Sequence, residues 1–331
     1  KLALVVILAL SAVAAYLYFS NHTGTIKKEL KDFSVKDTAQ VTGIFLADNF
    51  GNKVKLDRKS ESVWMVNDKY ETRKDAIKLI LGTIHTMEVK SPVSKASFEN
   101  VITQISAKHT KVEIYMGKNK PVKTFYVGGS TKDQFGTYMM LENSSVPFVM
   151  HIPGFFGYLS TRFFTEEENW RSTALFRYNL ENIEKIAVNY MEFPQESFEI
   201  EKISSKKPVV KSILTGKTIE NLDTLAVLYY ASKFQNINVE FYGNDLEAVR
   251  RDSIITHCKR FSVEITDIHG NKDLFTAFRK PMPEGSEDEE GNPQPFDKDR
   301  MYGLTKNGDF VLIQFFVFDE ITPRFAFFEQ E

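Results

Sequence analysis

The sequence predicts an α+β fold in which an N-terminal transmembrane helix is followed by two tandem duplicated units, each an antiparallel sheet with two helices. Three observations predict it: an apolar run at the start of the chain, alternating strand-like and helix-like segments after it, and a return to the same order of segments from Tyr178 onward. The composition, 42% hydrophobic and 26% charged, is typical of globular proteins. The expected parts are a transmembrane helix at 1–20, a tether at 21–36, a first α+β unit at 37–165, a connector at 166–179 and a second α+β unit at 180–331.

The apolar run covers Leu2–Phe19 and lies between Lys1 and the polar Ser20. At about 1.5 Å per residue, a helix of this length spans about 27 Å, close to the hydrocarbon thickness of a bilayer. Because lysines flank both sides of the run, the positive-inside rule does not choose an orientation. We expect the N-terminus inside and the body outside the cytoplasm, as in a usual signal anchor. A cleavable signal peptide, with Ala12-Val13-Ala14 as its small-x-small site, is the alternative.

One face of the expected helix carries small side chains that would let another transmembrane helix pack closely. The face consists of Leu8, Ser11, Ala12 and Ala15, with Ser11 and Ala15 at small-x-x-x-small spacing. This face predicts contact with integral membrane protein subunits in addition to the lipid bilayer. The simpler interpretation is that the alanines are apolar filler in an anchor.

The first unit is expected to begin with a hairpin, because two alternating segments, 41–48 and 54–57, flank the turn sequence of 49–52. Thr72 is expected to be the N-cap of a helix whose apolar residues continue at helical spacing to Ile84. The other expected elements are a second helix at 94–108 and strands at 62–66, 87–90, 112–115, 122–127, 137–141 and 148–152.

The second unit is expected to repeat this order of elements. The tripeptide Val-Glu-Ile recurs at Val112 and Val263, each time ahead of a turn sequence. A repeat with a period above about 100 residues indicates a domain duplication, and chance agreement between two common α+β orders is the alternative. An insertion at 281–296, rich in proline, glycine and carboxylates, is expected to be a mobile loop. The expected elements are strands at 183–188, 197–200, 237–240, 262–267 and 309–313 and helices at 218–234 and 246–259.

Composition and motif spacing argue against several classes of function. The net charge of −2 argues against nucleic-acid binding, and Cys258, the one cysteine, cannot form an internal disulfide or a cysteine metal cluster. The six histidines lack metal-binding spacing, and Gly128-Gly129 is expected to form a turn because the order of a phosphate loop is absent. The sequence contains no nucleophile–base motif and no cofactor fingerprint. We therefore expect a non-enzymatic protein without a cofactor or a metal.

Two aromatic stretches are candidate surfaces for a partner or for lipid. Phe155, Phe156 and Tyr158 lie among glycines and a proline, a loop-like setting in which large apolar side chains are costly unless covered. The stretch Phe310–Phe318 is too short to span a bilayer and is expected to be a strand buried on both faces. Burial in the core is the simpler interpretation for both stretches.

Several longer motifs carry a resemblance to a known family. They lie within about residues 30–200 and read Trp64-Met-Val-Asn-Asp-Lys-Tyr, Arg73-Lys-Asp-Ala-Ile, Val112-Glu-Ile-Tyr, Lys123-Thr-Phe-Tyr-Val-Gly-Gly, Gly136-Thr-Tyr-Met and His151-Ile-Pro-Gly-Phe. With these motifs the chain resembles the domain-of-unknown-function 4340 family of bacterial envelope proteins. Members are similar to auxiliary, non-ATPase proteins of gliding-motility-type ABC transporters, and the family has no established catalytic residues to transfer.

The resemblance implies a single-pass protein of the bacterial inner membrane with its body in the periplasm. The expected function is a non-enzymatic, membrane-anchored extracytoplasmic accessory subunit of an envelope complex of the transport, secretion or motility type. A periplasmic ligand-binding module is the alternative. Thr38 is a candidate O-glycosylation site, because Asp37-Thr38-Ala39 matches an acceptor pattern of some envelope proteins, although such short matches arise freely by chance.

Overall fold

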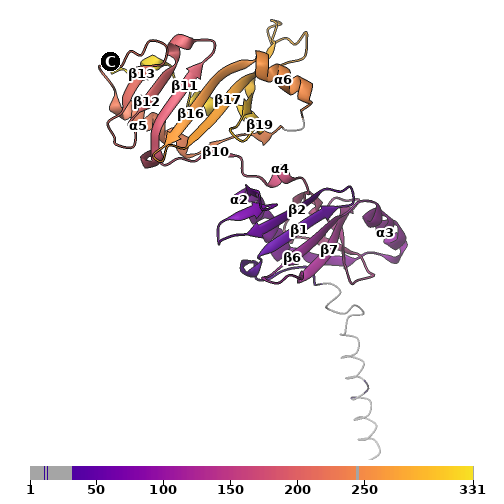
Figure 1. Cartoon of the computed structure of the whole chain (residues 1–331). Helices are drawn as coiled ribbons and strands as arrows, with labels where there is room; N and C mark the ends of the chain where they lie inside the picture. The colour runs from indigo at the N-terminus through magenta and orange to yellow at the C-terminus, as the bar shows by residue number, and fades with distance from the viewer. Residues whose placement is uncertain (1–10, 12, 14–31, 244–245, 331) are drawn as a thin grey trace, which may run out of the picture. The chain divides into compact units, whose positions relative to one another are not determined.

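The computed structural model of the chain describes residues 11, 13, 32–243 and 246–330, and from residue 32 onward these form two compact units (Figure 1). The first unit ends at Ser172 and the second begins at Thr173, a boundary that lies inside the range expected as the connector. Each unit has its own large antiparallel sheet and its own buried core. A separate two-stranded sheet pairs β10 (Ala174–Phe176) with β14 (Ile237–Asn238).

The first unit is built on a nine-stranded sheet with the order β4-β3-β2-β1-β6-β7-β8-β9-β5. The strands are β1 (Gly43–Asp48), β2 (Lys53–Arg58), β3 (Trp64–Val66), β4 (Tyr70–Glu71), β5 (Glu88–Pro92), β6 (Thr110–Tyr115), β7 (Lys123–Ser130), β8 (Thr137–Leu141) and β9 (Phe148–His151). The α-helices are α2 (Lys74–Thr86), α3 (Phe98–Ala107) and α4 (Glu167–Trp170).

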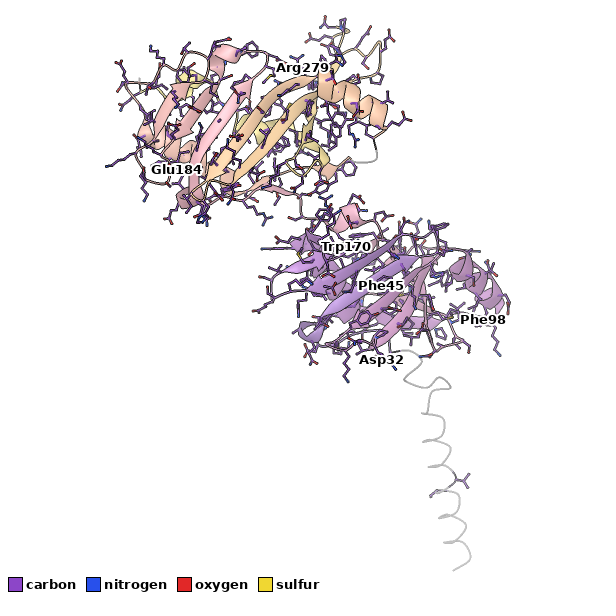
Figure 2. All side chains as sticks on the ribbon, in the orientation of Figure 1. Asp32, Phe45, Phe98, Trp170, Glu184 and Arg279 are labelled. Atoms are coloured by element: carbon purple, nitrogen blue, oxygen red, sulfur yellow. The ribbon has the colours of Figure 1, made fainter. Side chains whose placement is uncertain are left out.

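One face of this sheet carries the main core of the unit, and α3 packs on the other face against β7. Alternate residues of β1 and β6, such as Ile44 and Val112, belong to one core cluster together with Ile80 of α2. The period of two along the strands and the helical period along α2 therefore bring their apolar faces to the same core. Phe45, the neighbour of Ile44 on β1, lies on the sheet in Figure 2 and is half-buried.

The second unit is built on an eight-stranded sheet with the order β13-β12-β11-β16-β17-β18-β19-β15. The strands are β11 (Ile183–Tyr190), β12 (Phe198–Glu201), β13 (Val209–Ser212), β15 (Phe241–Tyr242), β16 (Lys259–Asp267), β17 (Lys272–Pro281), β18 (Phe296–Leu304) and β19 (Phe310–Gln314). The α-helices are α5 (Thr224–Ser232), α6 (Ala248–His257) and α7 (Phe315–Asp319).

The two large sheets have the same strand order. The run β3-β2-β1-β6-β7-β8-β9-β5 of the first unit corresponds strand for strand to the whole sheet of the second unit, and β4 is an additional edge strand. Val112 lies opposite Leu46 on β1, and Val263 lies opposite Val188 on β11. The two Val-Glu-Ile segments therefore occupy equivalent places, and this register assigns equivalent positions around them.

The expected α+β class is wrong, because antiparallel strands dominate both units and the helices are short. Among the described residues each unit has three α-helices, whereas two were expected. The helix expected at 1–20 lies outside the described residues except for positions 11 and 13. Within the part of the chain that the structure describes, no helix combines the length and the apolar character needed to cross a membrane.

Two of the expected helices start too early, because residues at their expected starts pair with strands. The Thr72 hydroxyl donates a hydrogen bond to the carbonyl of Trp64 (3.2 Å), and α2 begins only at Lys74. Thr218 forms an isolated β-bridge, and α5 begins only at Thr224. Tertiary pairing thus overrides a local helical pattern at both places.

The expectation of one buried strand over Phe310–Phe318 is also wrong. β19 ends at Gln314 and the chain turns into the short helix α7. Phe316 is 71% exposed while Phe318 is buried, because helical spacing separates side chains that a strand buried on both faces would cover.

Candidate functional site

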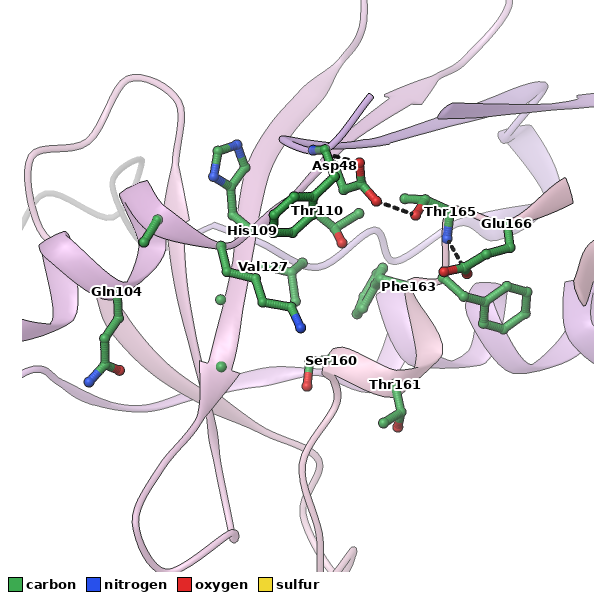
Figure 3. Close-up of a pocket in the computed structure, with 16 residues that line it drawn as sticks. Asp48, Gln104, His109, Thr110, Val127, Ser160, Thr161, Phe163, Thr165 and Glu166 are labelled. Carbon is green, nitrogen blue, oxygen red and sulfur yellow. Dashed lines mark hydrogen bonds between the residues drawn. The ribbon is translucent and has the colours of Figure 1, made fainter. Parts of the chain in front are cut away.

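An open cleft of about 620 Å³ lies at the end of the first sheet where β1 and β7 finish and β6 begins (Figure 3). We call it the first-unit cleft. Its lining comes from the β1–β2 turn, the end of α3 with the start of β6, the last residues of β7, and the segment 160–166 after β9. Strand pairing brings these segments together although they are far apart in the sequence.

Asp48, the last residue of β1, joins the β1–β2 turn to the segment after β9. Its Oδ1 accepts hydrogen bonds from the backbone N–H groups of Phe50 (2.9 Å) and Asn52 (3.0 Å). Its Oδ2 accepts the side-chain amide of Asn52 and the Thr165 hydroxyl, both at 2.9 Å (Figure 3). Burial by itself raises the pKa of Asp48, but the hydrogen bonds outweigh it and the pKa is lowered. Asp48 is therefore an ionised structural anchor whose oxygens are already occupied.

The end of α3 forms the opposite wall of the first-unit cleft. The Asn49 side-chain amide donates to the carbonyl of Ala107 (2.5 Å), one of the last carbonyls of this helix. Nδ1 of His109 lies 2.8 Å from the carbonyl oxygen of Ile105, which can only accept, so this nitrogen carries the proton. The imidazole packs edge-on against Tyr126, with ring centroids 5.2 Å apart. The wall is therefore held by side-chain contacts on both sides of the helix end.

Gly128 and Gly129 form the wall contributed by β7, at a point where its register with β8 shifts. A Cβ on Gly128 would lie 2.8 Å from Cγ1 of Ile105 and 3.1 Å from the carbonyl oxygen of Tyr138, so α3 packs against this strand only because the residue is glycine. A Cβ on Gly129 would meet nothing within 4 Å. The expected turn at these glycines is wrong, because both belong to β7.

The rest of the lining combines an apolar base with polar groups. Val127 and Phe163 are buried, whereas Lys108 and Thr161 are exposed and Ser160 is half-buried. Among the described residues, no group of three or more His, Cys, Asp or Glu side chains is placed to hold a metal ion. The arrangement offers one ammonium group and several hydroxyl groups above an apolar surface.

Four exposed phenylalanines lie in loops at this same end of the first sheet, and we call them the loop-end phenylalanines. They are Phe50 (68% exposed), Phe135 (48%), Phe155 (39%) and Phe156 (86%). The rings of Phe135 and Phe156 meet edge to face with centroids 6.2 Å apart. The guanidinium of Arg162 lies 4.4 Å from the ring centroid of Phe155. These contacts hold large apolar side chains at the surface, where their exposure to water is unfavourable.

The sequence pattern identified only part of this surface. Phe155 and Phe156 are exposed, but Tyr158 is half-buried. Phe50 and Phe135 did not stand out, although each directly precedes a glycine within a turn sequence. An apolar residue next to a turn glycine is the signal that would have found them.

The remaining predicted residues lie elsewhere. Thr38 is half-buried at the start of a short 3-10 helix whose N-cap is Asp37. Ser11 is described, helical and exposed. The other members of the predicted helix-packing face, Leu8, Ala12 and Ala15, lie outside the described residues.

Comparison with known families gives one match. The profile of the family described as domain of unknown function (DUF4340) matches residues 64–252, which is more than half of the chain. The match runs from β3 into α6 and so extends across the boundary between the two units. It includes every part of the first-unit cleft except the β1–β2 turn. No curated protein and no solved structure matches the chain.

Proposed function

The chain belongs to the DUF4340 family, and from that premise we propose that it is a non-enzymatic accessory subunit of a bacterial envelope complex of the transport, secretion or motility type. Both units act outside the cytoplasm, at the inner membrane, and the partners are integral membrane protein subunits of the complex. The apolar sequence of Leu2–Phe19 supports this location, as does the resemblance of the first unit to envelope proteins.

The observation that carries the proposal is the exposure of the loop-end phenylalanines. Burying one phenylalanine side chain completely contributes about 1.5–3 kcal/mol, so leaving four of them in water is unfavourable unless a partner covers them. Aromatic side chains are enriched at the centres of protein interfaces, where a few of them supply most of the binding energy. The end of the first sheet that carries the loop-end phenylalanines therefore has the character of a docking surface.

A photo-cross-linking residue at position 156 of the full chain tests this proposal in cells. We expect it to cross-link to an integral membrane protein, because Phe156 is the most exposed of the loop-end phenylalanines. The matched control is the same residue at position 249, since Val249 is 83% exposed but lies on α6 of the second unit. Cross-links from position 156 to lipid alone, or equal protein cross-links from both positions, would contradict the proposal.

The variant pair Phe135→Ser/Phe156→Ser gives a second readout of the same proposal. We expect the amount of co-purifying membrane protein to fall about tenfold or more, as truncation of interface hot spots does. Leu225→Ser/Val249→Ser removes side chains of similar exposure from the second unit and should leave co-purification unchanged.

A periplasmic ligand-binding module is a second candidate function, and the first-unit cleft favours it. Its volume of about 620 Å³ is within the range of small-molecule sites, and its lining combines buried apolar side chains with a few polar groups.

A further inference from the structure

An open groove of about 450 Å³ lies between α2 and the end of the first sheet where β2 finishes and β3 begins. We call it the α2 groove. Its helix wall carries Lys74, Lys78 and Gly82, which share one side of α2 because they are four residues apart. The opposite wall comes from the end of β2, the β2–β3 loop, the start of β3 and Thr38. No residue lines both this groove and the first-unit cleft.

Positive charge predominates in the α2 groove. Its lining holds three cations, Arg58, Lys74 and Lys78, and one carboxylate, Glu61. None of these four side chains forms an ion pair with another residue in the part of the chain that the structure describes. The nearest carboxylate along α2, that of Asp75, does not line the groove and is paired with an arginine. The excess of cations therefore attracts an anion.

Arg58 is held in place beside the groove and keeps hydrogen-bond donors. Its guanidinium lies 5.1 Å from the ring centroid of Trp64, and its Nη1 donates to the carbonyl of Ala39. Its Nε has no hydrogen-bond partner among the described residues. A guanidinium that is already ordered loses little freedom when it binds, and its planar set of N–H groups matches the oxygens of a phosphate.

The second unit lacks the two lysines although it has the same strand order. Counted from the N-cap of each helix, Thr224 and Leu228 of α5 stand where α2 has Lys74 and Lys78. The fold therefore does not require positive charge at these positions. The charge is a property of the first unit, as expected for a binding site.

The α2 groove lies at the end of the first sheet opposite to the loop-end phenylalanines. Arg58 is the last residue of β2 and Trp64 is the first residue of β3. Lys123, the first residue of β7, is at the same end, and its Nζ lies 2.8 Å from Oδ1 of Asp32. The chain that follows the apolar sequence Leu2–Phe19 thus joins the first unit at the end that carries the groove.

We infer that the α2 groove binds the phosphate headgroup of an anionic phospholipid. This inference rests on the membrane location in the proposed function and adds a lipid site to it. The phosphate pairs with the two ammonium groups and the Arg58 guanidinium, since lysines near a membrane surface attract anionic lipids. Trp64 and Ile77 are buried at the base of the groove, and the half-buried Leu81 gives an apolar surface beside the cations for the first methylene groups of the lipid.

Phosphatidylglycerol and phosphatidylcholine test the inference, because only the first of these phospholipids carries a net negative charge. The full chain is labelled with 5-fluorotryptophan, placed in phosphatidylcholine nanodiscs with increasing fractions of phosphatidylglycerol, and followed by fluorine NMR. The chain has two tryptophans, of which Trp64 lines the α2 groove and Trp170 does not. We expect the Trp64 resonance to shift as the fraction of phosphatidylglycerol rises and the Trp170 resonance to stay unchanged.

Two pairs of lysine variants separate specific binding from general attraction. Lys74→Gln/Lys78→Gln should raise the fraction of phosphatidylglycerol at half-maximal shift at least about fivefold, because both ammonium groups meet the headgroup. Lys95→Gln/Lys120→Gln removes the same charge from two exposed lysines of the first unit that do not line the groove. This matched control should leave the half-maximal fraction unchanged.

A glycine variant tests the space in the groove. A Cβ on Gly82 meets nothing within 4 Å, and leucine has a higher helix propensity than glycine, so Gly82→Leu fills the groove without destabilising α2. We expect it to weaken the phosphatidylglycerol-dependent shift of Trp64 at least about fivefold. Gly129→Leu also adds a side chain where a Cβ meets open space, but it does so in the first-unit cleft and should leave the shift intact.

Each other outcome overturns the inference. An equal Trp64 shift on adding inorganic phosphate or glycerol 3-phosphate to phosphatidylcholine nanodiscs would assign the groove to a soluble phosphate. A shift of Trp170 alone would place the lipid elsewhere, and equal losses in the two lysine pairs would show general attraction. The absence of any shift would exclude the lipid site. The accessory-subunit proposal is tested separately by the cross-links from position 156, so it stands or fails independently of these results.

Discussion

The two large sheets share one strand order and differ most at the end where β1 of the first unit and β11 of the second unit finish. In the first unit, β1 ends in Asp48, β7 carries a glycine pair just before its last residue, and a cleft of about 620 Å³ remains between the loops. In the second unit, β11 ends in Tyr190, β17 carries Phe278 and Arg279, and the corresponding cleft measures about 210 Å³. Topology therefore decides which loops meet, and the side chains at a few positions decide how much space is left between them.

The two cores also differ in side-chain size at one pair of equivalent positions. Phe125 and Phe275 occupy equivalent places on β7 and β17, and both are fully buried. The neighbouring strand carries Met139 in the first unit and Gly303 in the second. A Cβ on Gly303 would lie 2.3 Å from Cζ of Phe275, so the glycine makes room for this ring. Because the core is close-packed, a larger residue in place of Gly303 would overlap the ring of Phe275.

The largest expected effect is that of Trp170→Ala on the first unit. Trp170 is fully buried, its Nε1 donates to the carbonyl of Phe164 (3.0 Å), and its ring centroid lies 4.1 Å from that of Phe164. Removing a buried tryptophan typically costs about 3–5 kcal/mol. Hydrogen exchange of the full chain should show faster exchange throughout the first unit and unchanged exchange in the second. A uniform loss of protection in both units would show that they do not unfold independently.

The next effect separates the two glycines of β7. Gly128→Ala should destabilise the first unit by about 1–3 kcal/mol, because its Cβ would overlap Ile105 and the backbone of Tyr138. Gly129→Ala should change the free energy of unfolding by less than about 0.5 kcal/mol, because the added Cβ meets open space. Denaturant unfolding of both variants measures the difference. Equal losses in the free energy of unfolding would mean that both glycines are needed for their backbone conformation and not for the space that a missing side chain leaves.

The smallest effect is that of Tyr190→Phe on the second unit. The Tyr190 hydroxyl donates to the carbonyl of Pro323 (2.8 Å), and its loss should cost about 1 kcal/mol near neutral pH. Burial raises the pKa of Tyr190, so the neutral form is favoured in the folded chain. This stabilisation is fully present below the unfolded tyrosine value of about 10 and is lost as the pH rises through the folded value. Unfolding curves at pH 7 and at about pH 11 should therefore show a smaller cost of the variant under alkaline conditions, and a cost that grows with pH would contradict this account.

The pH dependence of the first unit should have the opposite direction. At the equivalent position Asp48 has a lowered pKa, so its contribution is present above the ordinary aspartate value of about 3.9 and is lost as the pH falls through the folded value. The equivalent ends of the two sheets are thus expected to lose stability in acid in the first unit and in alkali in the second.

Local sequence patterns located many strands and misjudged the fold class. Alternation along 41–48 and 112–115 predicted β1 and β6, because one buried face imposes a period of two on any half-covered strand. The same reasoning started helices at Thr72 and Thr218, whose own pairing partners belong to strands. A local pattern reports which residues are buried and cannot report a pairing partner many residues away.

The sequence by itself determined the family, since the resemblance to DUF4340 is confirmed by the match over residues 64–252. It also showed the Val-Glu-Ile recurrence, and the two copies lie at equivalent places in the two sheets. Only the tertiary structure decided that Asp48, Gly129 and Thr165 surround one cavity and that Phe50 lies at the same end of the sheet as Phe156. The physical reason is that a cavity depends on distances between side chains from separate segments, and those distances exist only after the strands have paired.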